Sequence, residues 1–261
     1  MVERECPIAD WLLLPGWGFG PSVFDELRAA LPTGLRVEAV ACREAAAAID
    51  RRVAAVTAGA AAPFGICAWS LGATVAITRA SVDAGAIAAM VLAGATPRFV
   101  AGDDQLPGMP MADFDAFRTL AATSLPSAQS RLASLSAMGS ADAPNLLRRL
   151  RRSFDRPGPG EAASAFRADL LAGLDCLREA DLRGVLHGLG MPVAVVHGMQ
   201  DALVPVQAAR AMAGAVSGAR WLPVAGGGHA LPVVHAALLA ATIEALATAE
   251  RHPSPQPLPS P

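Results

Sequence analysis

The chain has 261 residues, of which 53% are hydrophobic, and a formal net charge of −2 at pH 7. This length suffices for a large domain with a sizeable core, and the charge gives no global attraction to nucleic acid. No stretch of about 20 residues is free of polar breaks, which argues against a membrane-spanning helix. The charged N-terminus does not resemble an export signal. We therefore expect a cytoplasmic protein.

The four cysteines are far apart in the chain and form no C-x-x-C pair. This spacing argues against a zinc site and provides no disulfide framework. The cationic side chains are all arginines, because the chain has no lysine, and it also has no tyrosine. We expect neither a metal nor an organic cofactor.

Short apolar runs alternate with a helical pattern in the first part of the chain. We expect strands at 11–15, 35–40, 63–69 and 87–94, and a helix at 71–82.

The pattern changes after residue 97. Residues 98–185 contain helical patterns that are broken by proline and glycine and are rich in arginine. Strand-like runs return at 192–197 and 219–224, and a helical pattern follows at 230–249. The proline-rich residues 251–261 are expected to be a disordered tail.

Buried strands that alternate with helices indicate an α/β fold with a mostly parallel sheet flanked by helices. We expect the sheet domain to comprise residues 1–97 and 186–250. Residues 98–185 would then form a helical cap that is inserted into this domain.

A single hydroxyl, that of Ser70, lies where the third expected strand meets the first helix, in A-W-S-L-G. This pattern is close to G-x-S-x-G, the nucleophile elbow of α/β-hydrolases, a tight strand-to-helix turn that projects the serine hydroxyl. Ala68 replaces the first glycine and Gly72 is kept, so the turn remains possible. The alternative is an ordinary turn serine.

A nucleophilic serine needs a base, and the base needs a carboxylate to orient it. In α/β-hydrolases the chain order is Ser, then acid, then His. Asp201 and His229 follow the last two expected strands in that order, at the strand ends where such sheets place their sites. We predict the catalytic triad Ser70, Asp201 and His229; the alternatives are a loop-capping aspartate and a surface histidine. His197, at a strand end, and His235, inside the expected helix, fit less well.

Acyl transfer also needs hydrogen-bond donors for the oxyanion. The backbone N–H of Leu71, directly after the nucleophile, is one candidate. The second is the N–H of Trp17, in a loop that Gly16 and Gly18 make adaptable. The Trp17 indole could also line the acyl pocket, and the alternative for this residue is a core aromatic.

Several stretches together resemble the pimeloyl-[acyl-carrier-protein] methyl ester esterases of biotin synthesis. They are LLLPGWG at 12–18, the AWSLG elbow, DALVP at 201–205, GHA at 228–230, and the segments 96–110, 132–139 and 181–192. The resemblance covers most of residues 11–245. It implies a serine carboxylesterase that hydrolyses the methyl ester of pimeloyl-acyl-carrier protein.

The chain departs from this family at several places, and the N-terminal strands that precede the expected strand at 11–15 look truncated. Pro15 stands where the family usually has histidine, and Ala68 replaces the first elbow glycine. VACREAAAAIDRR replaces the D-L-P-G-x-G-x-S segment, and Leu132 replaces an expected aromatic. Two alternatives therefore stay open: a general short-chain carboxylesterase or thioesterase, and a hydrolase-like binding protein without turnover.

Arginines cluster in LLRRLRR, at a spacing that places several on one helical face. The resemblance implies that this face receives an acidic acyl-carrier protein, and the alternative is a solvated charged face. Apart from this carrier protein we expect no stable partner, so the protein itself is expected to be a monomer. The residues expected to bind substrate or carrier are Trp17, Arg131, Arg148, Arg149 and Arg152.

Overall fold

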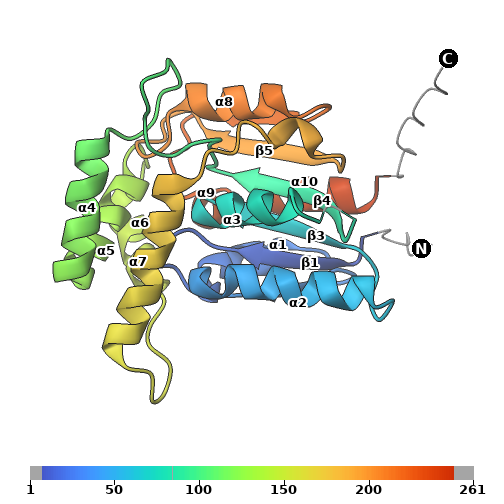
Figure 1. The fold of residues 1–261 in the computed structure, drawn as a ribbon, viewed down its shortest axis with the longest axis horizontal. Coiled ribbons are helices and arrows are strands. Elements are labelled where there is room, and N and C mark those ends of the chain that lie inside the picture. Colours follow the sequence, from blue (N-terminus) through green and yellow to red (C-terminus); the bar gives the residue numbers. More distant parts are fainter. Residues whose placement is uncertain (1–7, 84, 250–261) are drawn as a thin grey trace.

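The computed structural model describes residues 8–83 and 85–249, so the expected tail at 251–261 lies outside the described residues. One parallel sheet has the strand order β2-β1-β3-β4-β5-β6 (Figure 1). The strands are β1 (Asp10–Leu14), β2 (Arg36–Ala39), β3 (Phe64–Trp69), β4 (Ile87–Ala93), β5 (Val193–Gly198) and β6 (Arg220–Val224). The α/β fold with a parallel sheet is confirmed, and each strand lies within two residues of its expected position.

The middle strands are the most apolar because helices cover both faces of the sheet. Every residue of β3 and β5 is buried, as expected for strands inside a parallel sheet. The edge strand β6 is more exposed and contains Pro223, which an edge position tolerates.

Side chains that alternate along β1 enter two separate cores. Leu13 packs with α1 (Asp25–Ala30) and α10 (Ala236–Ala247), and Leu12 packs with α2 (Ala45–Thr57), α3 (Leu71–Ala80) and α8 (Val206–Ala215). This alternation is the period of two that a strand imposes. The two groups of helices form the layers on either side of the sheet (Figure 1). Short 3-10 helices are η1 (Pro21–Phe24), η2 (Cys42–Glu44) and η3 (Leu186–Gly188).

The expected single helix at 230–249 is wrong. The structure has α9 (Leu231–Val234) and then α10, and His235 between them leaves the helical conformation at φ −120° and ψ 36°. The break allows α9 to contact α1 and α6 (Ala143–Arg152), while α10 covers the sheet at β4.

Four helices between β4 and β5 form a layer beyond the sheet (Figure 1). They are α4 (Met111–Thr123), α5 (Leu125–Ala137), α6 and α7 (Ala163–Glu179). We call residues 98–185 the insertion; that they form a distinct cap domain stays a prediction. No helix within 8–83 or 85–249 is long and apolar enough to cross a bilayer.

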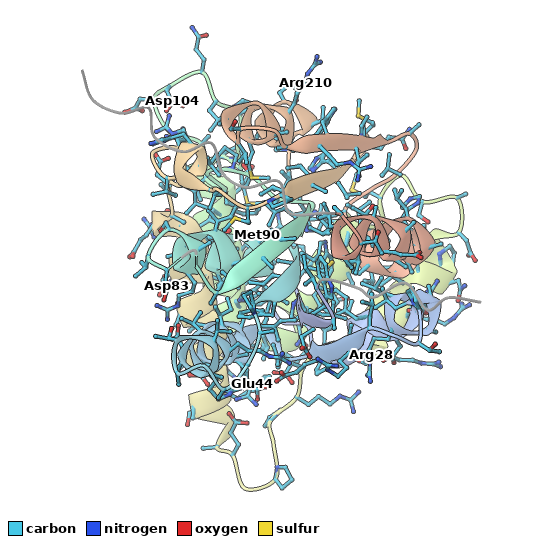
Figure 2. The ribbon with its side chains drawn as sticks, turned by 90° about the vertical axis from the view of Figure 1, so that its right-hand side faces the viewer. Arg28, Glu44, Asp83, Met90, Asp104 and Arg210 are labelled. Carbon is cyan, nitrogen blue, oxygen red and sulfur yellow. The ribbon has the colours of Figure 1, made fainter. Side chains whose placement is uncertain are left out.

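Ion pairs join the two ends of the insertion. Asp104 binds Arg98 through two hydrogen bonds of 2.6 and 2.9 Å, and Arg183 donates a further bond of 2.6 Å to its carboxylate. The Arg98 guanidinium in particular holds the pKa of Asp104 well below its usual range. Asp104 lies at the periphery, in contrast to Met90 in the middle of the sheet (Figure 2). The segments that leave β4 and approach β5 are thereby held together.

Buried thiols occur in the sheet layer. Cys67 lies in β3 and Cys42 begins η2, and within the described residues neither forms a disulfide. Burial raises the pKa of each of these two thiols to about 12. Both cysteines are therefore neutral at physiological pH.

Candidate active site

Ser70 occupies a strained turn between β3 and α3. Its φ of 55° and ψ of −121° make it the one non-glycine residue with positive φ in the described part of the chain. Such a conformation persists only where the surroundings enforce it, and it is concentrated at functional sites. The Ser70 N–H donates to Ala93 O at 3.0 Å, which ties the turn to β4. The turn projects the side chain away from the sheet.

The close approach of α3 to β1 explains the kept glycine of the elbow. A Cβ on Gly72 would lie 2.4 Å from the carbonyl oxygen of Leu14, so no larger residue fits. Ala68, in contrast, is an ordinary residue of β3 that pairs with Leu14 and Leu92, and its methyl group is fully buried. The alanine at this position is therefore compatible with the elbow.

His229 and Asp201 form a buried pair. Nδ1 of His229 lies 2.7 Å from Oδ2 of Asp201, within hydrogen-bond distance. The other carboxylate oxygen accepts the backbone N–H groups of Leu203 and Val204 at 2.8 and 2.9 Å. Burial opposes ionisation of Asp201, but the adjacent imidazole and the backbone donors outweigh it and lower its pKa. Asp201 is thus an ionised, rigid acceptor for the imidazole.

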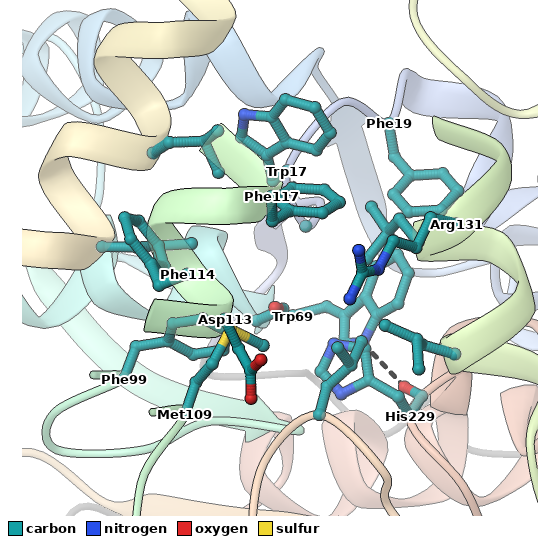
Figure 3. Close-up of a pocket in the computed structure, with 17 residues that line it drawn as sticks. Trp17, Phe19, Trp69, Phe99, Met109, Asp113, Phe114, Phe117, Arg131 and His229 are labelled. Carbon is teal, nitrogen blue, oxygen red and sulfur yellow. Dashed lines mark hydrogen bonds between the residues drawn. The ribbon is translucent and has the colours of Figure 1, made fainter. Parts of the chain in front are cut away.

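The catalytic candidate His229 is held from two further sides. The indole N–H of Trp69, directly before Ser70, donates to the carbonyl oxygen of His229 at 2.8 Å (Figure 3). Gly94 has φ +53°, and a Cβ there would lie 3.2 Å from the imidazole ring. Ser70 and His229 both line the same pocket. The three predicted triad positions are thus associated through this pocket and the Asp201 bond, while their catalytic roles stay a prediction.

Two other histidines lie away from this pocket. His197 is fully buried at the end of β5, with Nε2 3.1 Å from Val204 O and 3.9 Å from the Asp201 carboxylate. Burial lowers its pKa. His235 separates α9 from α10. Neither residue lines the pocket, in agreement with their poorer fit to the sequence pattern.

The two expected oxyanion donors flank the elbow. Leu71 begins α3, where backbone N–H groups have no acceptor within the helix. Among the described residues, no hydrogen-bond acceptor is found for the backbone N–H of Trp17 or of Leu71. Gly16, beside Trp17, is so close to the elbow that a Cβ there would lie 3.2 Å from Cβ of Ser70. Their role as an oxyanion hole stays a prediction.

The pocket above Ser70 encloses about 660 Å³, including its open mouth. Its wall is mostly apolar and comes largely from the insertion: Phe99, Met109, Phe114, Phe117, Leu132, Leu135, Leu174 and Leu177. The Trp17 indole completes this wall, because its N–H donates to Leu170 O at 2.6 Å and its ring meets Phe117 edge-on. Asp113 and Arg131 also line the pocket, and Figure 3 shows the Arg131 guanidinium directed into it.

A family model described as alpha/beta hydrolase fold matches residues 45–236. The chain is 38% identical to the pimeloyl-[acyl-carrier protein] methyl ester esterase of Stenotrophomonas maltophilia K279a over 68% of this chain and 66% of that protein. It is 30% identical to the protein of that name from Aromatoleum aromaticum, over 90% and 96% of the two chains. The chain belongs to this family of α/β-hydrolases. It spans just under two thirds of the Stenotrophomonas protein and nearly all of the Aromatoleum protein.

Solved structures agree with this assignment at the level of the fold. An esterase from Exiguobacterium antarcticum superposes with a TM-score of 0.75 over 92% of each chain, at 16% identity. The family resemblance inferred from the sequence motifs is confirmed by the family model and by the sequence relatives.

The arginines of this α/β-hydrolase do not all face solvent. Arg149 pairs with Glu26 of α1 and donates to Val233 O of α9 at 2.9 Å, so its guanidinium joins α6 to the sheet domain. Arg148 and Arg152 are exposed on α6. Arg131, on the neighbouring helix α5, lines the pocket. Arg149 is the member of the expected carrier-binding set that is least available to a partner.

Sequence reasoning missed the aromatic wall of the pocket in this α/β-hydrolase. Phe114 and Phe117 project from one face of α4, and Leu174 and Leu177 repeat the same spacing on α7. This i, i+3 spacing was a signal in the sequence, but it is shared with any helix that packs on a core. Trp69 was missed as well, because nothing in the elbow motif indicates that its indole holds His229.

Proposed function

We propose that this protein is a serine carboxylesterase that hydrolyses the methyl ester of pimeloyl-acyl-carrier protein in biotin biosynthesis. The observation that carries the proposal is the buried His229–Asp201 pair beside a serine in a strained elbow, at the base of an apolar pocket. Family membership supports the same reaction, because the relatives bear that name.

Each group of the site has one role in the proposed reaction. Ser70 attacks the ester carbonyl while His229 accepts its proton, and Asp201 holds the imidazole in orientation. The backbone N–H groups of Trp17 and Leu71 stabilise the oxyanion. His229 then protonates the departing methanol. Water hydrolyses the acyl-enzyme by the same route and releases the free carboxylate.

The pocket suits the proposed substrate. An aliphatic acyl chain is apolar, and burying it against aromatic and leucine side chains is favourable by about 0.8 kcal/mol per methylene group. A carrier-linked chain must also reach solvent, and Arg131, which lines the pocket and is itself exposed, gives the pocket a charged group for this route. We further propose that an acidic acyl-carrier protein delivers the chain, and that the protein acts in the cytoplasm as a monomer.

Replacement of the nucleophile tests the reaction. Ser70→Ala is expected to lower kcat at least about 1,000-fold for the methyl ester of pimeloyl-acyl-carrier protein, because the attacking oxygen is lost. The measurement is release of methanol, together with labelling by a fluorophosphonate probe. Ser81→Ala is the matched control, since this exposed serine ends α3 and hydrogen-bonds only within that helix.

Three outcomes would contradict the proposal at different levels. A Ser70→Ala variant that keeps a tenth of wild-type kcat would exclude Ser70 as the nucleophile. Absence of both turnover and labelling in the wild-type protein would favour a binding protein. Equal kcat/KM for the carrier-linked ester and a small soluble ester would favour a general esterase or thioesterase. Complementation of a biotin auxotroph that lacks the esterase would test the physiological substrate.

A further inference from the structure

The loop that carries Trp17 comprises residues 15–20, between β1 and η1, and we call it the oxyanion loop. Its backbone is fixed to two other segments. Gly18 N–H donates to Sγ of Cys42 at 3.1 Å, and Cys42 N–H donates to Phe19 O at 3.1 Å. On the other side, Gly20 N–H donates to Ser153 O at 2.8 Å, and Asp155 N–H donates to Gly18 O at 2.8 Å. These bonds use the polar backbone groups that follow Trp17, while the Trp17 N–H itself remains available to an oxyanion.

The second of these segments, residues 153–155, belongs to the insertion and directly follows α6. Phe154 reinforces it by stacking on Phe19, with the ring centroids 4.5 Å apart. The geometry of the oxyanion loop therefore depends on where the insertion places residues 153–155.

Arg43, adjacent to Cys42 in η2, binds this part of the insertion. Its Nε donates to Asp155 at 2.9 Å and its Nη1 donates to Glu161 at 2.9 Å. Asp169 of α7 lies 3.8 Å away, and the guanidinium stacks over the Phe166 ring at 5.2 Å. The Arg43 side chain is only 18% exposed, so these interactions are shielded from solvent.

The short helix η2 thus provides both attachments of the oxyanion loop. Cys42 holds the oxyanion loop directly, and Arg43 holds the residues that contact the loop from the other side. This element lies in the sequence VACREAAAAIDRR, directly after β2.

We propose that Arg43 is a positioning residue, which holds residues 153–155 against the oxyanion loop and so keeps the Trp17 N–H directed at the reacting carbonyl. This proposal rests on the proposed esterase activity. Arg43 does not line the pocket, so it acts through the loop and not on the substrate.

The test is Arg43→Met, which keeps an unbranched apolar side chain but removes the guanidinium group and its charge. Loss of one oxyanion donor lowers kcat by about 100-fold to 1,000-fold, and a loosened donor should cost less. We expect kcat for a small soluble ester to fall by about 10-fold to 100-fold, with KM changed less than about threefold. Affinity for an alkyl boronic acid, which forms a tetrahedral adduct with Ser70, should fall in parallel with kcat, whereas affinity for a non-covalent substrate analogue should not.

Arg118→Met is the matched control. Arg118 forms a comparable pair with Asp175, through bonds of 2.6 and 2.9 Å, but it joins α4 to α7 without contacting the oxyanion loop. Asp155→Asn weakens the proposed attachment from the opposite side, and its effect on kcat should not add to that of Arg43→Met. Arg43→Lys should recover part of kcat, because an ammonium group can pair with one of the carboxylates.

The outcomes separate this proposal from the proposed function. Inactivity of the wild-type protein toward esters would reject the function and the positioning role together. If the wild-type protein is active, equal kcat in Arg43→Met and Arg118→Met would reject the positioning role alone. If Arg43→Met does not fold, Arg43→Lys and Asp155→Asn decide: unchanged kcat and boronic acid affinity in both would overturn the proposal.

Discussion

The strained backbone of Ser70 is enforced by its neighbours rather than by the serine itself. Its N–H is bound by Ala93, and α3 is drawn against the end of β1 at Gly72. Neither feature requires a glycine at position 68, because that residue is in regular strand conformation. The elbow motif therefore contains one glycine with a steric function and one position that accepts alanine.

Substitution of Gly72 tests this steric argument. Gly72→Ala would bring its Cβ against the Leu14 carbonyl, and we expect the free energy of unfolding to fall by about 1–3 kcal/mol, as in other overpacked cores. Urea unfolding measures the change. Gly214→Ala is the control: it is in α8 with no atom within 4 Å of the added Cβ, and should be neutral or stabilising. Equal stabilities of the two variants would refute the argument.

The candidate residues Ser70, Asp201 and His229 could be predicted because each follows a recognisable strand in a fixed order. The contacts that hold them could not. The Trp69 indole reaches a residue 160 positions away, and the Gly18–Cys42 bond joins two segments that are 24 residues apart. Local pattern contains no information on such distant contacts, which depend on how the layers pack.

At the scale of elements, α6 combines two functions on different faces. Leu146 and Leu150 are buried, and Arg149 beside them joins the helix to α1 and α9. Arg148 and Arg152 project into solvent. The arginine run was predicted from sequence, but its division between an inward and an outward face was not. The four arginines of LLRRLRR fall on one half of the helix, and the pattern does not show which of them meets a neighbouring element.

Charge reversal on the outward face tests carrier docking. In the double variant Arg148→Glu and Arg152→Glu, KM for a carrier-linked ester should rise by about 3-fold to 10-fold at low salt. Hydrolysis of a small soluble ester should stay unchanged, and the rise in KM should shrink above about 0.15 M salt, where the screening length is roughly 8 Å. Steady-state kinetics at several salt concentrations provide the measurement.

The control for this experiment changes the net charge equally. Arg210→Glu with Arg220→Glu reverses two exposed arginines on α8 and β6, away from α6. If both double variants raise KM alike, the effect is one of overall charge. If neither does, the outward arginines are only a solvated face, and the proposed carrier docking on α6 is wrong.

The whole molecule could be predicted in outline. Apolar runs of strand length that alternate with helices indicate a parallel sheet, and the change of pattern after residue 97 indicates where the insertion begins. The break at His235 could not be predicted, since Leu231 to Ala247 reads as one apolar helix. It arises because α9 must reach α6 while α10 follows the sheet, a constraint that exists only in the assembled fold.

Stability at alkaline pH is a property of the whole molecule. The folded-state pKa of Cys67 is raised from 9.0 to about 12. The contribution of this thiol to the free energy of unfolding is therefore fully present below pH 9 and is lost as the pH rises toward 12. A pKa shift of three units corresponds to about 4 kcal/mol in the free energy of unfolding. Cys67→Ala should therefore flatten the fall in unfolding free energy between pH 9 and 11, as measured by urea titration. Cys176→Ala, at a half-buried thiol, should flatten it less; equal slopes in all three proteins would contradict this.

The same buried thiols allow the opening of different parts of the molecule to be timed. A thiol reacts with an alkylating reagent only when it is exposed and deprotonated, so Cys42 and Cys67 can react only through transient opening. Cys67, in the middle of the sheet, requires disruption of the core. Cys42 requires only that η2 separate from the oxyanion loop. The ratio of the alkylation rate of Cys42 to that of Cys67 therefore reports how much more often the oxyanion loop is released than the domain unfolds. Loss of the Arg43 charge should increase this ratio.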